Sequence, residues 1–66
     1  MELSVNGASH SLNSGNTLSA LLNELGVTEG RFAVEVNGEI VPKSQHTEFE
    51  LQTNDNVEIV RAIGGG

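Results

Sequence analysis

The sequence predicts an α+β domain in which one helix packs on one face of a mixed β-sheet. A single strong helical repeat of leucines follows an opening hairpin signal, and the rest of the chain reads as short strands. One amphipathic helix must bury its apolar stripe against one face of the sheet, which gives two layers. At 66 residues the chain has room for one small domain with a single core, so stability must come from compact regular structure.

The opening segment is expected to form a β-hairpin. Polar and apolar residues alternate from residue 2, and the dipeptide Asn6-Gly7 follows. This dipeptide is typical of tight hairpin turns because both residues tolerate positive φ. We expect strands near residues 2–6 and 8–12, with Leu12 pointing inward from the second strand.

One helix is predicted after a polar break. Thr17 can cap it by accepting a hydrogen bond from an orphan backbone N–H group, and Gly26 can end it in a left-handed conformation. Four leucines between these caps follow the i, i+3, i+4, i+7 spacing of one helical face. This apolar stripe consists of Leu18, Leu21, Leu22 and Leu25.

The second half of the chain reads as strands joined by short turns. A third strand is predicted over residues 31–36, and Asn37-Gly38 then turns the chain into the apolar piece Ile40-Val41. Pro42 ends that piece because it has no N–H donor. Residues 43–46 are expected to form a turn or a single helical turn.

Two more strands complete the prediction, over residues 47–51 and 57–63. The connection through the helix is long enough to place the first strand and later strands in parallel in the middle of the sheet. The expected architecture is a mixed sheet of four to five strands in a domain of residues 1–63, followed by a flexible glycine tail at 64–66. This arrangement is the β-grasp fold.

The composition narrows the classes of partner. Nine Asp and Glu against three Lys and Arg give a formal charge of −6, and there is no Tyr, Trp or Cys. Such a surface repels nucleic acids and anionic membranes and offers little base stacking. It fits an acidic docking module or a merely soluble surface. Without a secretory signal or a long apolar run, we expect a cytoplasmic protein that is monomeric when free.

Side-chain chemistry gives weak signals. His10 and His46 have no third ligand at zinc-like spacing and read as surface or turn histidines, so no metal site is predicted. The carboxylates of Glu48, Glu50 and Glu58 fit a solvated face better than an acid-base pair. No catalytic residue is predicted.

The last three residues, Gly64, Gly65 and Gly66, suggest a slim arm that carries an α-carboxylate. Extended, they reach at most about 10 Å, and without Cβ atoms they fit a narrow channel. A carboxylate with a pKa near 3.5 is a poor electrophile. Since the chain has no phosphate-binding GxxxxGK[ST] loop, activation of this group must occur on a partner that holds the nucleotide.

Several stretches resemble the thiamine-biosynthesis sulfur carrier proteins, the ThiS family of ubiquitin-like β-grasp domains. The resemblance covers essentially the whole chain and is carried by "TLSALLNEL", "VEVNGEIVPKSQ", "FEL" and "DNVEIVRAIGGG". Gly64 departs from the family, in which many members have alanine or another small residue there. The last two positions are still glycine, so the implied mechanism is unaffected.

The resemblance implies a carrier that acts as a protein co-substrate and is not itself an enzyme. An E1-like adenylyltransferase would adenylate Gly66 with ATP and magnesium, although the carrier itself binds no cofactor. Sulfur would then replace AMP to leave a thiocarboxylate, which thiazole synthase would accept, while Gly64 and Gly65 supply reach. Val60 and Ala62 on the open sheet face are the expected docking residues for both enzymes, together with the adjacent residues Arg61 and Ile63.

Two alternatives remain open. One is a related β-grasp protein, either the small subunit of molybdopterin synthase, which is usually longer, or a ubiquitin-like modifier. The other is an interaction module whose terminal glycines are only a loose end. Deletion of Gly65 and Gly66 would leave the function of such a module untouched.

Overall fold

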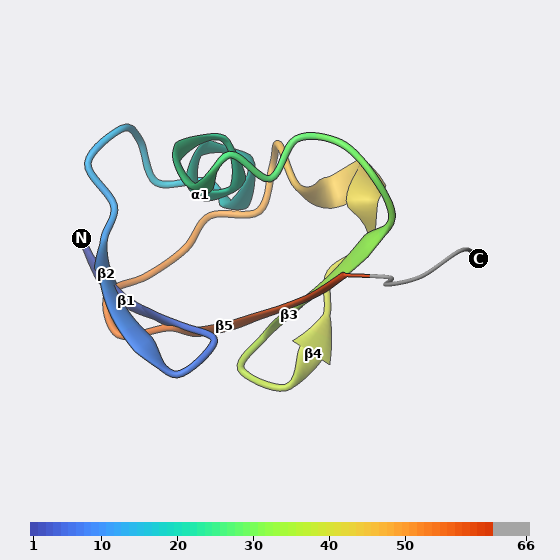
Figure 1. Ribbon diagram of the computed structural model, residues 1–66. Helices are drawn as coiled ribbons and strands as arrows, with labels where there is room; N and C mark the ends of the chain where they lie inside the picture. The colour runs from blue at the N-terminus through green and yellow to red at the C-terminus, as the bar shows by residue number, and fades with distance from the viewer. Residues whose placement is uncertain (62–66) are drawn as a thin grey trace.

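The computed structural model describes residues 1–61 and has two layers, with one helix lying across one face of a five-stranded sheet (Figure 1). The helix α1 spans Leu18–Leu25, and a short 3₁₀ turn, η1, spans Lys43–Gln45. The strands are β1 (Glu2–Val5), β2 (Ala8–Ser11), β3 (Phe32–Val36), β4 (Glu39–Ile40) and β5 (Asn56–Arg61).

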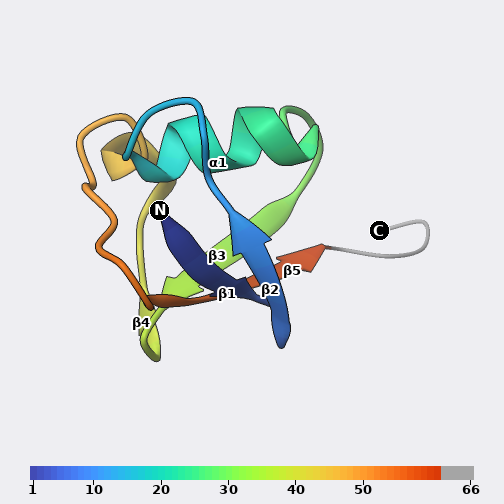
Figure 2. The ribbon, with the colours of Figure 1, turned by 90° about the vertical axis from the view of Figure 1, so that its left-hand side faces the viewer.

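The strand order is β2-β1-β5-β3-β4. Strands β1 and β5 run parallel, and the other neighbouring pairs are antiparallel. Figure 2 shows α1 above the sheet, and Figure 1 shows β5 between β1 and β3. The predicted α+β β-grasp architecture with a parallel central pair is therefore confirmed.

The core lies between α1 and the sheet. Residues Val34 and Val57, on β3 and β5, are almost fully buried, as are Leu18 and Leu21 of the helix. The predicted leucine stripe thus provides the helical half of the core, with Leu25 packed at its margin. The buried apolar residues are Leu3, Leu12, Leu18, Leu21, Leu22, Val34, Val36, Val41, Leu51 and Val57.

Both ends of α1 carry the predicted caps. The Thr17 side chain accepts a hydrogen bond from the Ala20 backbone N–H at 3.1 Å. Gly26 lies at φ 78°, and its N–H is directed to the Asn23 and Leu22 carbonyls. A left-handed conformation costs glycine little, so this residue ends the helix without strain.

The predicted strand over residues 47–51 is wrong. This segment contains only an isolated bridge between Thr17 and Glu50, and no strand pairs with it. Phe49 is half-buried against the core, and Leu51 is buried within it. The segment is held instead by single backbone hydrogen bonds, from Leu18 N–H to the Phe49 carbonyl at 2.9 Å and from Leu51 N–H to the Asn16 carbonyl at 2.7 Å. Alternation correctly indicated burial, but it did not indicate sheet pairing.

Two other predictions need adjustment. The apolar piece at 40–41 enters the sheet only at Ile40, whereas Val41 turns inward and is buried. His46 lies in the turn that follows η1, which is one of the two expected settings, but it is buried: it is only 7% exposed and its Nε2 lies 3.0 Å from the Val41 carbonyl. The last predicted strand is described up to Arg61. Residues 62 and 63 lie outside the described residues.

Candidate functional site

The candidate site is the C-terminal end of β5, where the sheet leads into the glycine tail. Arg61, the last residue of β5, lies opposite Phe32 at the start of β3. The sequence-predicted residues beyond it fall outside the described part of the chain. These are Ala62, Ile63, Gly64, Gly65 and Gly66.

The strand β5 is held by β3 up to that end, and on its other side it is held as far as Ile59. On one side β3 pairs with it from Val36 to Phe32. On the other side the backbone pairing with β1 covers only the first part of β5. A side chain continues the ladder, because the Ile59 N–H donates to Asn6 Oδ1 at 2.7 Å and Asn6 Nδ2 donates to the Ile59 carbonyl at 3.3 Å.

Asn6 reaches Ile59 because of the hairpin turn that contains it. Its backbone lies at φ 50°, a left-handed conformation that asparagine adopts more readily than most residues. In the second Asn-Gly turn, Asn37 makes a similar contact at the start of β5, where its Oδ1 accepts from the Asn56 N–H at 2.9 Å. The two turns therefore hold β5 at its first residue, Asn56, and at Ile59, two residues before its end.

Val60 is on the sheet face that α1 leaves uncovered. Successive side chains of β5 point to opposite faces, and Val57 is 0% exposed whereas Val60 is 60% exposed. On β3, Ala33 lies opposite Val60 and is exposed. The predicted placement of Val60 on the open face agrees with this alternation.

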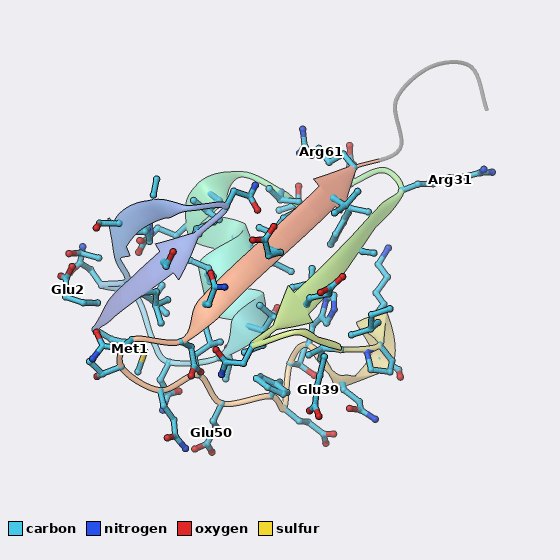
Figure 3. All side chains as sticks on the ribbon, turned by 90° about the horizontal axis from the view of Figure 1, so that it is seen from below. Met1, Glu2, Arg31, Glu39, Glu50 and Arg61 are labelled. Atoms are coloured by element: carbon cyan, nitrogen blue, oxygen red, sulfur yellow. The ribbon has the colours of Figure 1, made fainter. Side chains whose placement is uncertain are left out.

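Arg61 is exposed but belongs to the alternate set of β5 side chains, in register with the half-buried Phe32. A shallow hollow of about 330 Å³ at this end is lined by Arg61, Arg31, Phe32, Ala33 and Val60. In Figure 3 the two arginines lie at the same end of the sheet, while Glu39 and Glu50 lie at the opposite end. Val60 and Arg61 are therefore neighbours at this end of the sheet, but Val60 belongs to the open face and Arg61 to the alternate set of side chains.

Glu48, Glu50 and Glu58, which were expected to be solvated and not an acid-base pair, are all exposed. Glu48 and Glu50 are exposed in the segment before β5, whereas Glu58 lies within β5. Opposite Glu58, on the same open face, β3 places Glu35. The sequence reasoning missed this pair because it depends on the register between two strands far apart in the chain.

His10 takes part in a polar contact away from the tail. Its Nε2 lies 2.7 Å from the Glu24 carboxylate at the end of α1. Glu24 also accepts from the Asn13 N–H at 3.2 Å and from Ser14 Oγ at 3.0 Å. The hydrogen bond from Asn13, followed by that from His10, lowers the pKa of Glu24 below its ordinary value. This group fastens the helix to the preceding loop.

Within residues 1–61, no group of three or more His, Asp or Glu side chains is arranged to hold a metal ion. None of the described helices is long and apolar enough to cross a membrane.

Comparisons with known proteins agree with this fold. Thiazole synthases from Paramagnetospirillum magneticum and Magnetococcus marinus are 46% and 38% identical to the chain over 66 residues. The chain spans only 20% of the length of each of these proteins. The crystal structure of the thiamine biosynthesis protein ThiS from Geobacter metallireducens superposes with a TM-score of 0.82 at 29% identity, with all of both chains covered.

The family comparison covers nearly the whole sequence. The model of the ThiS family matches residues 2–66, from β1 through the glycine tail. The match therefore includes the helix and all five strands of the described structure. The chain therefore belongs to the ThiS family.

Proposed function

We propose that this chain is a sulfur carrier of thiamine biosynthesis that is loaded as a thiocarboxylate at Gly66. The observation that carries the proposal is the ThiS family match, which continues through Gly66. The proposal is supported by the position of β5, which pairs with β3 up to Arg61, with only Ala62 and Ile63 between it and the glycines in the sequence. In this role the chain is a protein co-substrate and not a catalyst.

Loading would begin with activation of the Gly66 carboxylate. Ionised at neutral pH, this group resists nucleophilic attack. An E1-like adenylyltransferase, which holds ATP and magnesium, would join the carboxylate to AMP and release pyrophosphate. A sulfur nucleophile would then displace AMP and leave the thiocarboxylate. Gly64 and Gly65 would let the tail enter a channel too narrow for side chains.

Delivery would take place on thiazole synthase. The proposal is supported by the two relatives named thiazole synthase, each of which contains a segment similar to this chain. The open face near Val60 would dock both enzymes, with Arg61 at its rim and Ala62 and Ile63 continuing toward the tail. Docking there would bring the tail close to the partner's active site, because only Ala62 and Ile63 separate the end of β5 from the glycines in the sequence.

The test is the intact mass of the protein after incubation with an E1-like adenylyltransferase, ATP, magnesium and a sulfur source. Replacement of one oxygen by sulfur raises the mass by about 16 Da, which methionine oxidation also does. A reaction without ATP controls for oxidation of Met1, and alkylation of the product identifies the thiocarboxylate. An ATP-dependent, alkylatable gain is expected. A terminus that stays unchanged with a competent enzyme would contradict the proposal, as would conjugation of the chain to lysines.

A further inference from the structure

The open face carries a mixed acidic and apolar surface at its centre. Across strands β5, β3 and β4, Glu58 lies opposite Glu35, and Glu35 lies opposite Ile40. In the next row along β5, Val60 lies opposite Ala33. Side chains directly opposite each other point to the same face of a sheet. We call these five residues the open-face cluster: Ala33, Glu35, Ile40, Glu58 and Val60.

The apolar members of this cluster are unusually exposed. Ile40 is 68% and Val60 is 60% exposed, and both are among the large hydrophobic residues that the described structure leaves in contact with solvent. Ala33 is also exposed. Covering these side chains would remove apolar surface from water and favour association.

The two glutamates have no cationic partner in the described chain. Between residues 1 and 61, the only ion pair within bonding distance joins His10 to Glu24. The three Lys and Arg residues of the sequence lie elsewhere, with Arg31 and Arg61 at the end of the sheet and Lys43 over the Phe32 ring. Like charges placed directly opposite on neighbouring strands destabilise a sheet. A cation supplied from outside would relieve this repulsion.

We infer that the open-face cluster binds a basic side chain, flanked by apolar ones, on the surface of thiazole synthase. The inference rests on the proposed delivery of sulfur and adds the chemistry of the docking surface. An arginine suits the position between Glu35 and Glu58, because its planar guanidinium donates to two carboxylates at once. Apolar neighbours of that arginine would cover Ile40 and Val60.

Charge excludes two other occupants. A second copy of this chain, packed face to face, would bring a second Glu35–Glu58 pair against the first without a cation on the cluster. A nucleic acid would be repelled by the same carboxylates and by the net charge of −6. A basic protein surface is complementary to both features.

The inference is tested by comparing the affinity of two matched double variants for purified thiazole synthase. Glu35→Gln with Glu58→Gln removes the charges of the cluster. Glu48→Gln with Glu50→Gln removes the same number of charges from exposed positions before β5. Calorimetry on the full-length chains gives the dissociation constants at low and high salt, and thermal unfolding gives their stabilities.

We expect the cluster variant to bind at least about tenfold more weakly and with less salt dependence, while the control variant stays within about twofold of the unsubstituted chain. The cluster variant should be as stable as the unsubstituted chain or slightly more stable, because the like-charge pair is gone. If the cluster variant bound as tightly as the unsubstituted chain, the inference would be overturned. Equal weakening by both variants, or no binding by the unsubstituted chain, would also overturn it.

Sulfur loading separates this outcome from the proposed function. If the unsubstituted chain gains the thiocarboxylate but the cluster variant binds thiazole synthase normally, the docking inference fails and the carrier function stands. If docking depends on the cluster but no thiocarboxylate ever forms, the carrier function fails and the docking surface stands. If the cluster variant bound the adenylyltransferase more weakly but bound thiazole synthase normally, the assignment to thiazole synthase would also be overturned.

Discussion

The two faces of the sheet differ sharply although the same strands build both. Toward the helix, β3 and β5 present Val34, Val36 and Val57, which are all buried. Toward solvent, alternate residues of the same strands present two carboxylates and the exposed Val60. One face therefore provides stability, whereas the other is available for recognition. Strand periodicity lets a small chain serve both purposes with neighbouring residues.

The difference in stability between the two faces is tested most directly by one substitution on each face. Val57→Ala removes two methyl groups from a site with no solvent exposure and should lower the free energy of unfolding by about 2 kcal/mol. For a domain of this size the melting temperature should fall by roughly 10 °C. Chemical denaturation and thermal melts measure both effects.

Val60→Ala is the matched control, because it makes the same change three residues along β5 on the open face. Its effect on unfolding should stay within about 0.5 kcal/mol, while binding to thiazole synthase should weaken. If the two variants lost similar stability, the division of labour between the faces would be wrong.

A smaller loss of stability is expected when the contact between Asn6 and Ile59 of β5 is removed. Asn6→Gly keeps a residue that tolerates positive φ but removes both side-chain hydrogen bonds to Ile59. The loss should be about 1 kcal/mol. Hydrogen exchange measured by NMR should show faster exchange of the Ile59 amide.

The Leu21 amide is a suitable internal reference, because it donates to the Thr17 carbonyl at the start of α1 and not to a residue of β5. Unchanged protection of Ile59 in the Asn6→Gly variant would mean that the two Asn6 side-chain hydrogen bonds do not stabilise β5 at this residue.

The smallest effect is expected on the helix side, at the exposed polar contacts of Glu24. Hydrogen bonds hold the pKa of this carboxyl below its ordinary value of 4.5. Its ionised form therefore stabilises the fold at higher pH, and this contribution is lost as the pH falls through the lowered folded-state pKa. Glu24→Gln should lower the melting temperature slightly at neutral pH and less at about pH 3.

Glu29→Gln, which removes the same charge from an exposed position after the helix, is the control for Glu24→Gln. A loss for Glu24→Gln that persists unchanged into acid would show that packing, and not the charge, holds this contact.

Local patterns in the sequence predicted much of the fold. The leucine spacing, the Thr17 cap and the Gly26 terminus depend on residues within two turns of helix, and they are found as expected. The two Asn-Gly turns carry the positive φ angles that hairpins of this kind require. The segment around Phe49 and Leu51 was misassigned because burial of alternate residues can arise without a neighbouring strand.

The candidate site was predicted less completely, because much of it depends on long-range register. Val60 was placed on the open face by alternation alone. The opposition of Glu35 and Glu58, and the contact between Asn6 and Ile59, join residues far apart in the chain. No local pattern specifies either of them. Residues 62–66, which include the glycine tail, lie outside the described structure, and their role stays a proposal.

The central claim is that sulfur is carried on the carboxyl group of Gly66. It is tested most directly by comparing the intact mass of the chain with that of a chain extended by one alanine after Gly66, each incubated with the adenylyltransferase, ATP and a sulfur source. We predict that the unextended chain gains an alkylatable sulfur while the extended chain, equally stable, gains none. Equal sulfur loading of both chains, without removal of the added alanine, would contradict the claim.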